Sequence, residues 1–200
     1  PLKISGLTVG GQAGTLRLNI SSGESYILGG FYQQDPTNVS HKTTAAFLTA
    51  SIARVWRSGS TGTSFITDNN SGSFYTVIDP TQYDNNGVLT VTSGGSYTIQ
   101  RVFFNPFTGR THVYYGQNQY NTAGEALANL SSDTFTEAQY TAHQYVFVAY
   151  LIVKSNTTDL TSTADNKIVQ AGLFRNTVGS SGGTSLTPAL NDISDVTLTT

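Results

Sequence analysis

The chain has 200 residues, enough for one large domain with a sizeable core, and only 11% of them are charged, against about 25% in ordinary domains. The net charge of −2, with lysines and arginines scattered along the chain, excludes the clustered basic face that nucleic-acid binding requires. Cysteine is absent, which excludes disulfides and thiolate metal sites, and abundant Thr, Ser and Asn predict a polar but mostly uncharged surface.

The N-terminal part of the chain contains short strand patterns separated by turns. Leu2–Val9 and Thr15–Ile20 are the first two, and in the second one Leu16, Leu18 and Ile20 alternate with polar residues, which predicts one buried face. Residues 1–20 lack the apolar core of a signal peptide.

The next part is less regular. Residues 21–42 are rich in turn-forming residues and are expected to run irregularly over the surface. Thr43–Arg57 fits both helical and strand spacing, and we favour a strand over Ile52–Arg57 that turns into a second one at Ser64–Thr67. Further short elements are expected at Phe74–Ile78, Val88–Thr92 and Lys167–Phe174.

Tyr97–Phe104 and Arg110–Tyr115 form the clearest hairpin pattern in the sequence. The connecting Asn105–Gly109 has proline where a type I turn needs φ near −65°, and it ends in glycine, which tolerates positive φ. We expect its tip to present Phe107 beside Arg110, which makes these two candidate interface or ligand-contact residues. The alternative is that Phe107 folds back on its own sheet.

Two later segments are strongly patterned. Thr122 and Glu125 form a capping box, which predicts a short helix over residues 123–130. Tyr145–Lys154 contains nine successive apolar or aromatic residues without strict alternation, which predicts a central strand covered on both faces. No apolar run reaches the 18 residues or so of a bilayer span, so we expect no membrane insertion.

These elements predict an all-β fold: an antiparallel β-sandwich or barrel-like domain over residues 1–175, with one short helix near 123–130. Within this domain, an alternative interpretation of residues 1–50 is an N-terminal attachment arm. Residues 176–188 have the composition of a Gly/Ser linker. Residues 189–200 are expected to pack on sister chains or on a following module through four apolar side chains: Leu190, Ile193, Val196 and Leu198.

No motif meets the requirements of a catalytic or metal site. Gly179–Gly183 matches the G-x-S-x-G pattern of serine hydrolases but lies in the Gly/Ser linker, without the flanking strand and helix. The three histidines are isolated, and Asp68–Gly72 lacks the register of a calcium loop, so it is interpreted as a turn. Four carboxylates are spaced too irregularly to identify a glycosidase pair: Asp79, Asp84, Asp133 and Glu137.

Asp79 and Asp84 fit local backbone capping, while a cleft assembled from distant strands stays open as an alternative. We therefore predict a chain without catalytic activity, cofactor or metal.

The order of several segments resembles β-rich modules of bacteriophage virion appendages: tail fibres, head fibres and related receptor-binding proteins. The similarity extends over roughly residues 50–200. The segments that carry it are Arg-Val-Phe-Phe-Asn-Pro-Phe-Thr-Gly at 101–109, Val-Tyr-Tyr-Gly-Gln-Asn-Gln-Tyr at 113–120, the small helix, Val148–Lys154, Thr158–Leu160 and the closing Leu-Asn-Asp-Ile-Ser-Asp-Val at 190–196.

The resemblance implies a homotrimeric structural protein of the virion. Its partners would be other virion proteins and host cell-surface glycan. The alternatives are a carbohydrate-binding module and a tailspike-like polysaccharide depolymerase domain.

Overall fold

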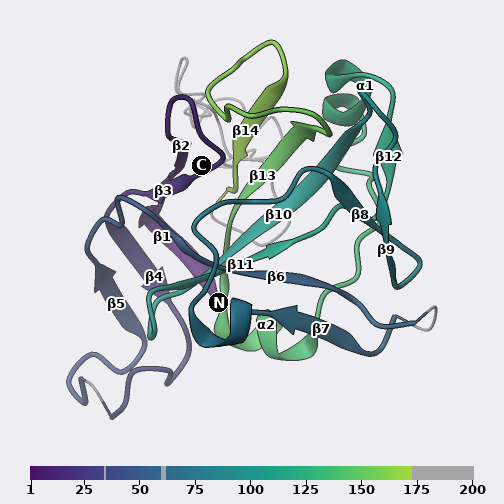
Figure 1. Cartoon of the computed structure of the whole chain (residues 1–200). Helices are drawn as coiled ribbons and strands as arrows, with labels where there is room; N and C mark the ends of the chain where they lie inside the picture. Colours follow the sequence, from purple (N-terminus) through teal and green to yellow (C-terminus); the bar gives the residue numbers. More distant parts are fainter. Residues whose placement is uncertain (34, 60–61, 173–200) are drawn as a thin grey trace, which may run out of the picture.

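The computed structural model describes residues 1–33, 35–59 and 62–172, and the fold is predominantly β (Figure 1). A mixed sheet in the order β14-β13-β10-β11-β6-β7 forms its centre, with β12 paired beside β10. β6 and β11 are parallel, and the other pairs are antiparallel. The strands are β6 (Ser51–Arg57), β7 (Phe65–Asp68), β10 (Tyr97–Asn105), β11 (Arg110–Tyr114), β12 (Gln119–Tyr120), β13 (Val146–Lys154) and β14 (Asn166–Gln170).

Smaller sheets and short helices complete the fold, so the expected all-β class with a short helix is confirmed. A three-stranded sheet has the order β1-β4-β5, and two hairpins pair β2 with β3 and β8 with β9. These strands are β1 (Leu2–Gly6), β2 (Val9–Gly11), β3 (Leu18–Ile20), β4 (Gly23–Tyr26), β5 (His41–Thr44), β8 (Gln82–Asn85) and β9 (Val88–Val91). The helices are α1 (Ala123–Ala128), α2 (Gln139–Gln144) and a 3-10 turn at Asn70–Gly72.

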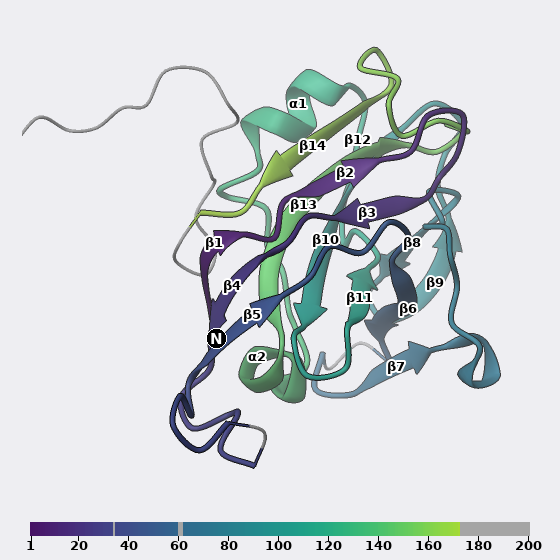
Figure 2. The same cartoon turned by 90° about the vertical axis from the view of Figure 1, so that its left-hand side faces the viewer.

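β10 and β13 lie at the centre of the core because both of their faces are covered. All of β10 is buried, and so is β13 apart from its last residue. One face, with Val102 and Leu151, shares an apolar cluster with Leu18 and other residues of the N-terminal strands, which lie as a layer in front of the sheet in Figure 2. The opposite face, with Phe103, packs with Ala126 of α1. The expected two-sided burial of Tyr145–Lys154 is confirmed.

Residues 1–50 are part of this packed body, and two expectations for the N-terminal half are wrong. Residues 21–42 are not irregular throughout, because they contain β4 and the start of β5. Gly23 resembles a turn residue in sequence, but a Cβ there would lie 2.4 Å from the carbonyl oxygen of Ser5, so glycine permits close pairing of β1 and β4. Phe74–Ile78 forms one isolated bridge instead of a strand, and Phe74 has φ of 58°.

The capping box at the start of α1 is present in altered form. Thr122 Oγ1 accepts the backbone N–H of Glu125 at 3.0 Å, and Glu125 Oε2 accepts the N–H of Asn121 at 2.9 Å. α2 was not anticipated, because its N-cap residue, Ala138, makes no side-chain cap. Within the described ranges, no helix is long and apolar enough to cross a bilayer.

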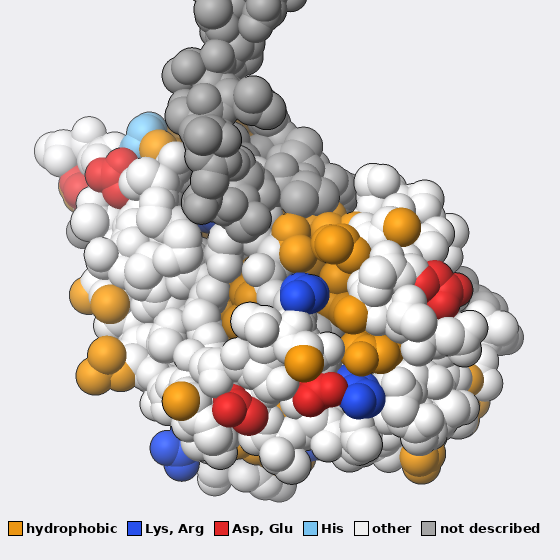
Figure 3. Space-filling view, turned by 90° about the horizontal axis from the view of Figure 1, so that it is seen from above, with side chains coloured by type: hydrophobic (Ala, Val, Ile, Leu, Met, Phe, Trp, Pro, Cys, Tyr) orange, Lys and Arg blue, Asp and Glu red, His pale blue; other side chains and the backbone are white. Residues whose placement is uncertain are grey.

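The surface seen from above is largely uncharged, with isolated acidic and basic side chains (Figure 3). This agrees with the expectation of a neutral polar surface from the composition. The loop between β4 and β5 extends from the body at the lower edge of both ribbon views.

Candidate functional site

The β10–β11 turn has the expected hairpin geometry, with Gly109 at φ of 68°. Asn105 Oδ1 accepts the backbone N–H groups of Phe107 at 2.9 Å and of Thr108 at 3.2 Å, which fixes the tip as an Asx turn. The local sequence therefore determines the backbone of the turn.

The structure does not bring Phe107 and Arg110 together, so the expected exposed pair is wrong. The ring of Phe107 stacks on Phe31, with centroids 4.4 Å apart, and is half-buried against the core. The Arg110 guanidinium lies instead over Phe74, 4.3 Å from the ring centroid. Phe107 thus folds back onto the protein, where it stacks on Phe31 of the β4–β5 loop and packs against the core cluster.

Exposed apolar side chains nevertheless gather beside the turn. Leu28 is 82% exposed and Tyr32 is 68% exposed, and both belong to the β4–β5 loop. Two shallow hollows of about 360 and about 470 Å³ meet at Phe107, one lined by Tyr32 and the other by Leu28. No carboxylate, lysine or arginine occurs among the described residues that line them. We call the surface formed by Leu28, Tyr32 and Phe107 the Phe107 surface.

Two anchors hold the loop that carries this surface. Phe31 is 1% exposed and inserts into the core between the two exposed side chains. Further along, Asp35 Oδ1 accepts hydrogen bonds from the hydroxyl and the N–H of Thr37 and from the N–H of Asn38. The bond from the Thr37 hydroxyl lowers the pKa of the Asp35 carboxyl. The exposed residues are therefore held out by a folded loop.

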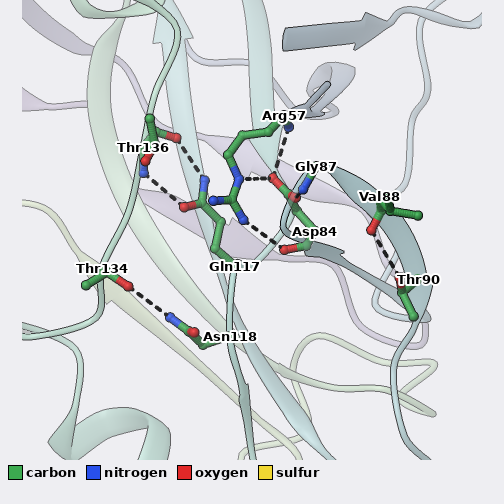
Figure 4. A network of polar contacts seen from close by, with 9 residues as sticks. All are labelled: Arg57, Asp84, Gly87, Val88, Thr90, Gln117, Asn118, Thr134 and Thr136. Atoms are coloured by element: carbon green, nitrogen blue, oxygen red, sulfur yellow. Dashed lines mark hydrogen bonds and ion pairs between the residues drawn. The ribbon is translucent and has the colours of Figure 1, made fainter. Parts of the chain in front are cut away.

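Asp79 and Asp84 do cap local turns, as expected, but each also has a distant partner. Asp84 Oδ1 accepts the Gly87 N–H at 2.7 Å, while Oδ2 accepts Arg57 Nε at 2.8 Å inside the protein (Figure 4). Asp79 Oδ1 accepts the N–H and hydroxyl of Thr81, and Oδ2 lies 3.7 Å from Arg54 Nη1. Asp79 thus links the segment before β8 to β6, and Asp84 links the β8–β9 hairpin to β6.

Asp133 forms the most buried ion pair among the described residues. Its Oδ2 lies 2.9 Å from Arg101 Nη2, and the two side chains are 1% and 5% exposed. Its Oδ1 accepts Tyr120 Oη at 2.5 Å and Asn118 Nδ2 at 2.7 Å. Burial, followed by the hydrogen bond to Asp133, raises the pKa of the Tyr120 phenol. The Arg101 guanidinium also lies 4.1 Å from the ring centroid of Phe135.

Asp133 and Glu137 line one small polar cavity of about 230 Å³, together with Arg101. A glycosidase needs two carboxylates that are accessible to the sugar. Asp133 accepts two hydrogen bonds at Oδ1, forms its ion pair with Arg101 through Oδ2, and is almost fully buried. The cavity thus has the chemistry of a charge cluster that holds the segment after α1 on the sheet, and not that of an acid/base pair.

Side-chain amides reinforce this attachment. Gln117 pairs with the backbone of Thr136, donating to its carbonyl at 2.8 Å and accepting its N–H at 3.0 Å (Figure 4). This is the pattern of a strand pairing, supplied by one carboxamide. The polar network therefore fixes the position of an irregular segment.

Asp68–Gly72 forms a turn, with Asp68 Oδ1 accepting the N–H of Asn70, as expected. No group of three or more potential metal-ligating side chains occurs in the part of the chain that the structure describes. The Gly179–Gly183 motif, the linker at 176–188 and four contact candidates lie outside the described residues: Leu190, Ile193, Val196 and Leu198.

Leu28 and Tyr32 were missed by sequence reasoning. The signal for them in the sequence was the presence of two large apolar side chains in a turn-rich stretch. Such residues are usually buried, so their position in a surface loop indicates a contact surface. Comparison with known proteins adds no assignment: no family model, no curated protein and no solved structure matches the chain.

Proposed function

We propose that the chain is a non-enzymatic structural component of a bacteriophage virion appendage, which attaches to other virion proteins, recognises the host surface, or does both. The order of the sequence segments at 97–120, 123–130, 148–154 and 190–196 supports this class. The observation that carries it is the Phe107 surface, because it exposes large apolar side chains on a rigid β body next to hollows without charged residues.

The expected assembly is a homotrimer. Low charge suits this, because charged residues are depleted at the cores of subunit interfaces. Sedimentation equilibrium of the 200-residue chain tests it: a species of three times 21.3 kDa is expected, and a monodisperse monomer would contradict the assembly.

Substitution of Tyr32 by alanine should weaken assembly or ligand binding by about 1–3 kcal/mol, because an exposed aromatic side chain is a typical anchor of an interface. Its exposure means that the free energy of unfolding should barely change. The matched control is Val91→Ala on β9, which is 72% exposed and lies away from the β4–β5 loop in both ribbon views. Equal effects of the two substitutions on assembly would contradict the assignment of the Phe107 surface.

Substitution of Phe107 by alanine should instead lower the free energy of unfolding by about 2 kcal/mol, since a half-buried ring loses its stacking on Phe31. Urea denaturation checks this value. Unchanged stability, together with weaker assembly, would show that Phe107 contributes only to a partner contact.

A carbohydrate-binding module is the second candidate. The exposed ring of Tyr32 beside an uncharged hollow favours it, because aromatic faces stack on sugars. Retention of the wild-type chain on a cell-surface glycan array, lost in Tyr32→Ala and kept in Val91→Ala, would support this function. Loss of trimerisation without any glycan retention would support the structural one.

A further inference from the structure

An apolar groove lies at the opposite end of the molecule from the Phe107 surface. It has a volume of about 400 Å³ and is lined by Leu127 of α1, by Leu160, by Ile168 and Val169 of β14, and by Gly11 of β2. Leu127 is 46% exposed. In the view from above, hydrophobic side chains gather along a hollow on this face (Figure 3). We call it the α1–β14 groove.

The groove runs beside an unpaired strand edge. β14 is the last strand of the central sheet and pairs only with β13 among the described strands. At its end, the carboxamide of Gln170 bonds to Val9, accepting its N–H at 2.9 Å and donating to its carbonyl at 2.8 Å. The Gln170 side chain thus takes the place of a neighbouring strand for Val9 of β2, while the backbone edge of β14 itself pairs with no described strand on this side. An exposed edge beside an apolar groove is the geometry that binds an extended peptide.

The groove also carries a positive charge. Lys167 lines it, and its Nζ donates to the uncharged carbonyl of Thr163 at 2.7 Å. Lys167 forms no ion pair within the described ranges. A suitable peptide would therefore combine apolar side chains with carboxylates.

The sequence after β14 contains such a peptide. Residues 189–200 include two carboxylates, Asp192 and Asp195, and no lysine or arginine, and they contain four large apolar side chains: Leu190, Ile193, Val196 and Leu198. The described chain ends at Gly172, directly after the strand that lines the groove. The intervening residues 173–188 can span up to roughly 55 Å when extended, which is ample for a return to the groove.

We propose that the α1–β14 groove binds the chain's own segment 189–200 in an extended conformation along the free edge of β14. Side chains alternate along an extended segment, so Ile193 packs on Leu127 while Leu190, Val196 and Leu198 pack on the other side of the edge, against Leu160 and Ile168, and Asp192 or Asp195 faces Lys167. This inference stands on the groove and the sequence of the segment, and it does not depend on the appendage function.

Disulfide trapping in the 200-residue chain tests the proposal, because this chain has no cysteine of its own. The variant Leu127→Cys with Ile193→Cys is oxidised with copper phenanthroline and resolved by non-reducing electrophoresis and mass spectrometry. The control is Ile66→Cys with Ile193→Cys, since Ile66 on β7 has a similar exposure of 41% and lies at the other end of the molecule.

An intrachain disulfide should form at least tenfold faster in the Leu127 variant than in the control. Equal rates, or no disulfide in the Leu127 variant, would overturn the proposal. Predominant cross-linking between two chains would assign the groove to the segment of a second copy and would also overturn the intrachain occupant.

A second measurement avoids introduced cysteines. The 200-residue variant Ile193→Asp with Val196→Asp should show about tenfold faster hydrogen exchange of the β14 amides at residues 167–169. Exchange in β6 and β7 should be unchanged, which is the internal control. Unchanged protection of β14 would contradict binding of the segment along its edge.

Discussion

Replacement of Asp133 by asparagine should lower the free energy of unfolding by about 3–5 kcal/mol, because it leaves the Arg101 guanidinium charged and without its counter-charge inside the protein. The same substitution weakens the acceptor for Tyr120 and Asn118. Urea denaturation followed by the fluorescence of Trp56, the single tryptophan, measures this loss.

The matched control is Asp165→Asn, which breaks the ion pair to Lys154 at the surface. Its effect should be much smaller, because water screens exposed pairs. The double variant Arg101→Met with Asp133→Leu should recover part of the loss, since it removes both buried charges together. Similar losses in Asp133→Asn and Asp165→Asn would contradict the structural role assigned to the buried pair.

The Arg101–Asp133 pair is one of three arginine–aspartate contacts that join peripheral segments to the central sheet, with Arg54–Asp79 and Arg57–Asp84. In a chain with so few charged residues, a substantial part of its charge thus serves internal attachment. The small number of charged residues on the surface is therefore explained in part by the pairing of charges within the fold.

Local signals in the sequence predicted the elements that depend on local physics. Three elements are determined by their own residues, and the structure has all of them: the Asn105–Gly109 turn, the Thr122–Glu125 capping box and the apolar strand at 145–154. α2 lacks a side-chain cap and could not be found in this way. Likewise, nothing in the sequence indicates that β6 and β11 are parallel.

The side-chain contacts of the candidate site could likewise not be predicted from local sequence. The turn chemistry of Asn105–Gly109 indicates a tip, but the position of the Phe107 ring depends on Phe31, which comes from a distant loop. Arg101 lies within an apolar strand pattern, and its counter-charge, Asp133, belongs to an irregular segment after α1. A buried arginine predicts a carboxylate partner, but only the fold identifies which carboxylate it is.

His112 should make the fold sensitive to mild acid. It lies on β11, is 5% exposed, and its ring stacks on Tyr145 with centroids 4.0 Å apart. Its Nε2 lies 2.9 Å from the hydroxyl of Tyr145, and the ring of Tyr140 meets it edge-on. Burial lowers the pKa of His112 from 6.5 to about 4. The folded protein therefore keeps this histidine neutral at a pH where the unfolded chain would protonate it.

Proton linkage determines that the stability of the folded state falls as the pH falls. As the pH falls below 6.5, His112 binds a proton in the unfolded state, whereas in the folded state it binds one only near pH 4. The contribution of the neutral histidine to stability is therefore complete above pH 6.5 and is lost as the pH falls from 6.5 to 4. Since one pH unit corresponds to about 1.4 kcal/mol per proton, the loss over this window should total about 3 kcal/mol. Asp35, Asp159 and Asp165 have lowered pKa values, so their contributions are lost below their ordinary value of 3.8.

Denaturant unfolding of His112→Gln from pH 7 to pH 4 isolates this effect, because glutamine has no proton to bind and can still bond to the Tyr145 hydroxyl. The variant should lose much less stability between pH 6.5 and 4 than the wild type does. His41→Gln removes an exposed histidine of β5 and should keep the acid-sensitive phase of the wild type. If His112→Gln instead follows the wild-type profile, the acid sensitivity arises elsewhere, and the buried histidine–tyrosine stack is not its source.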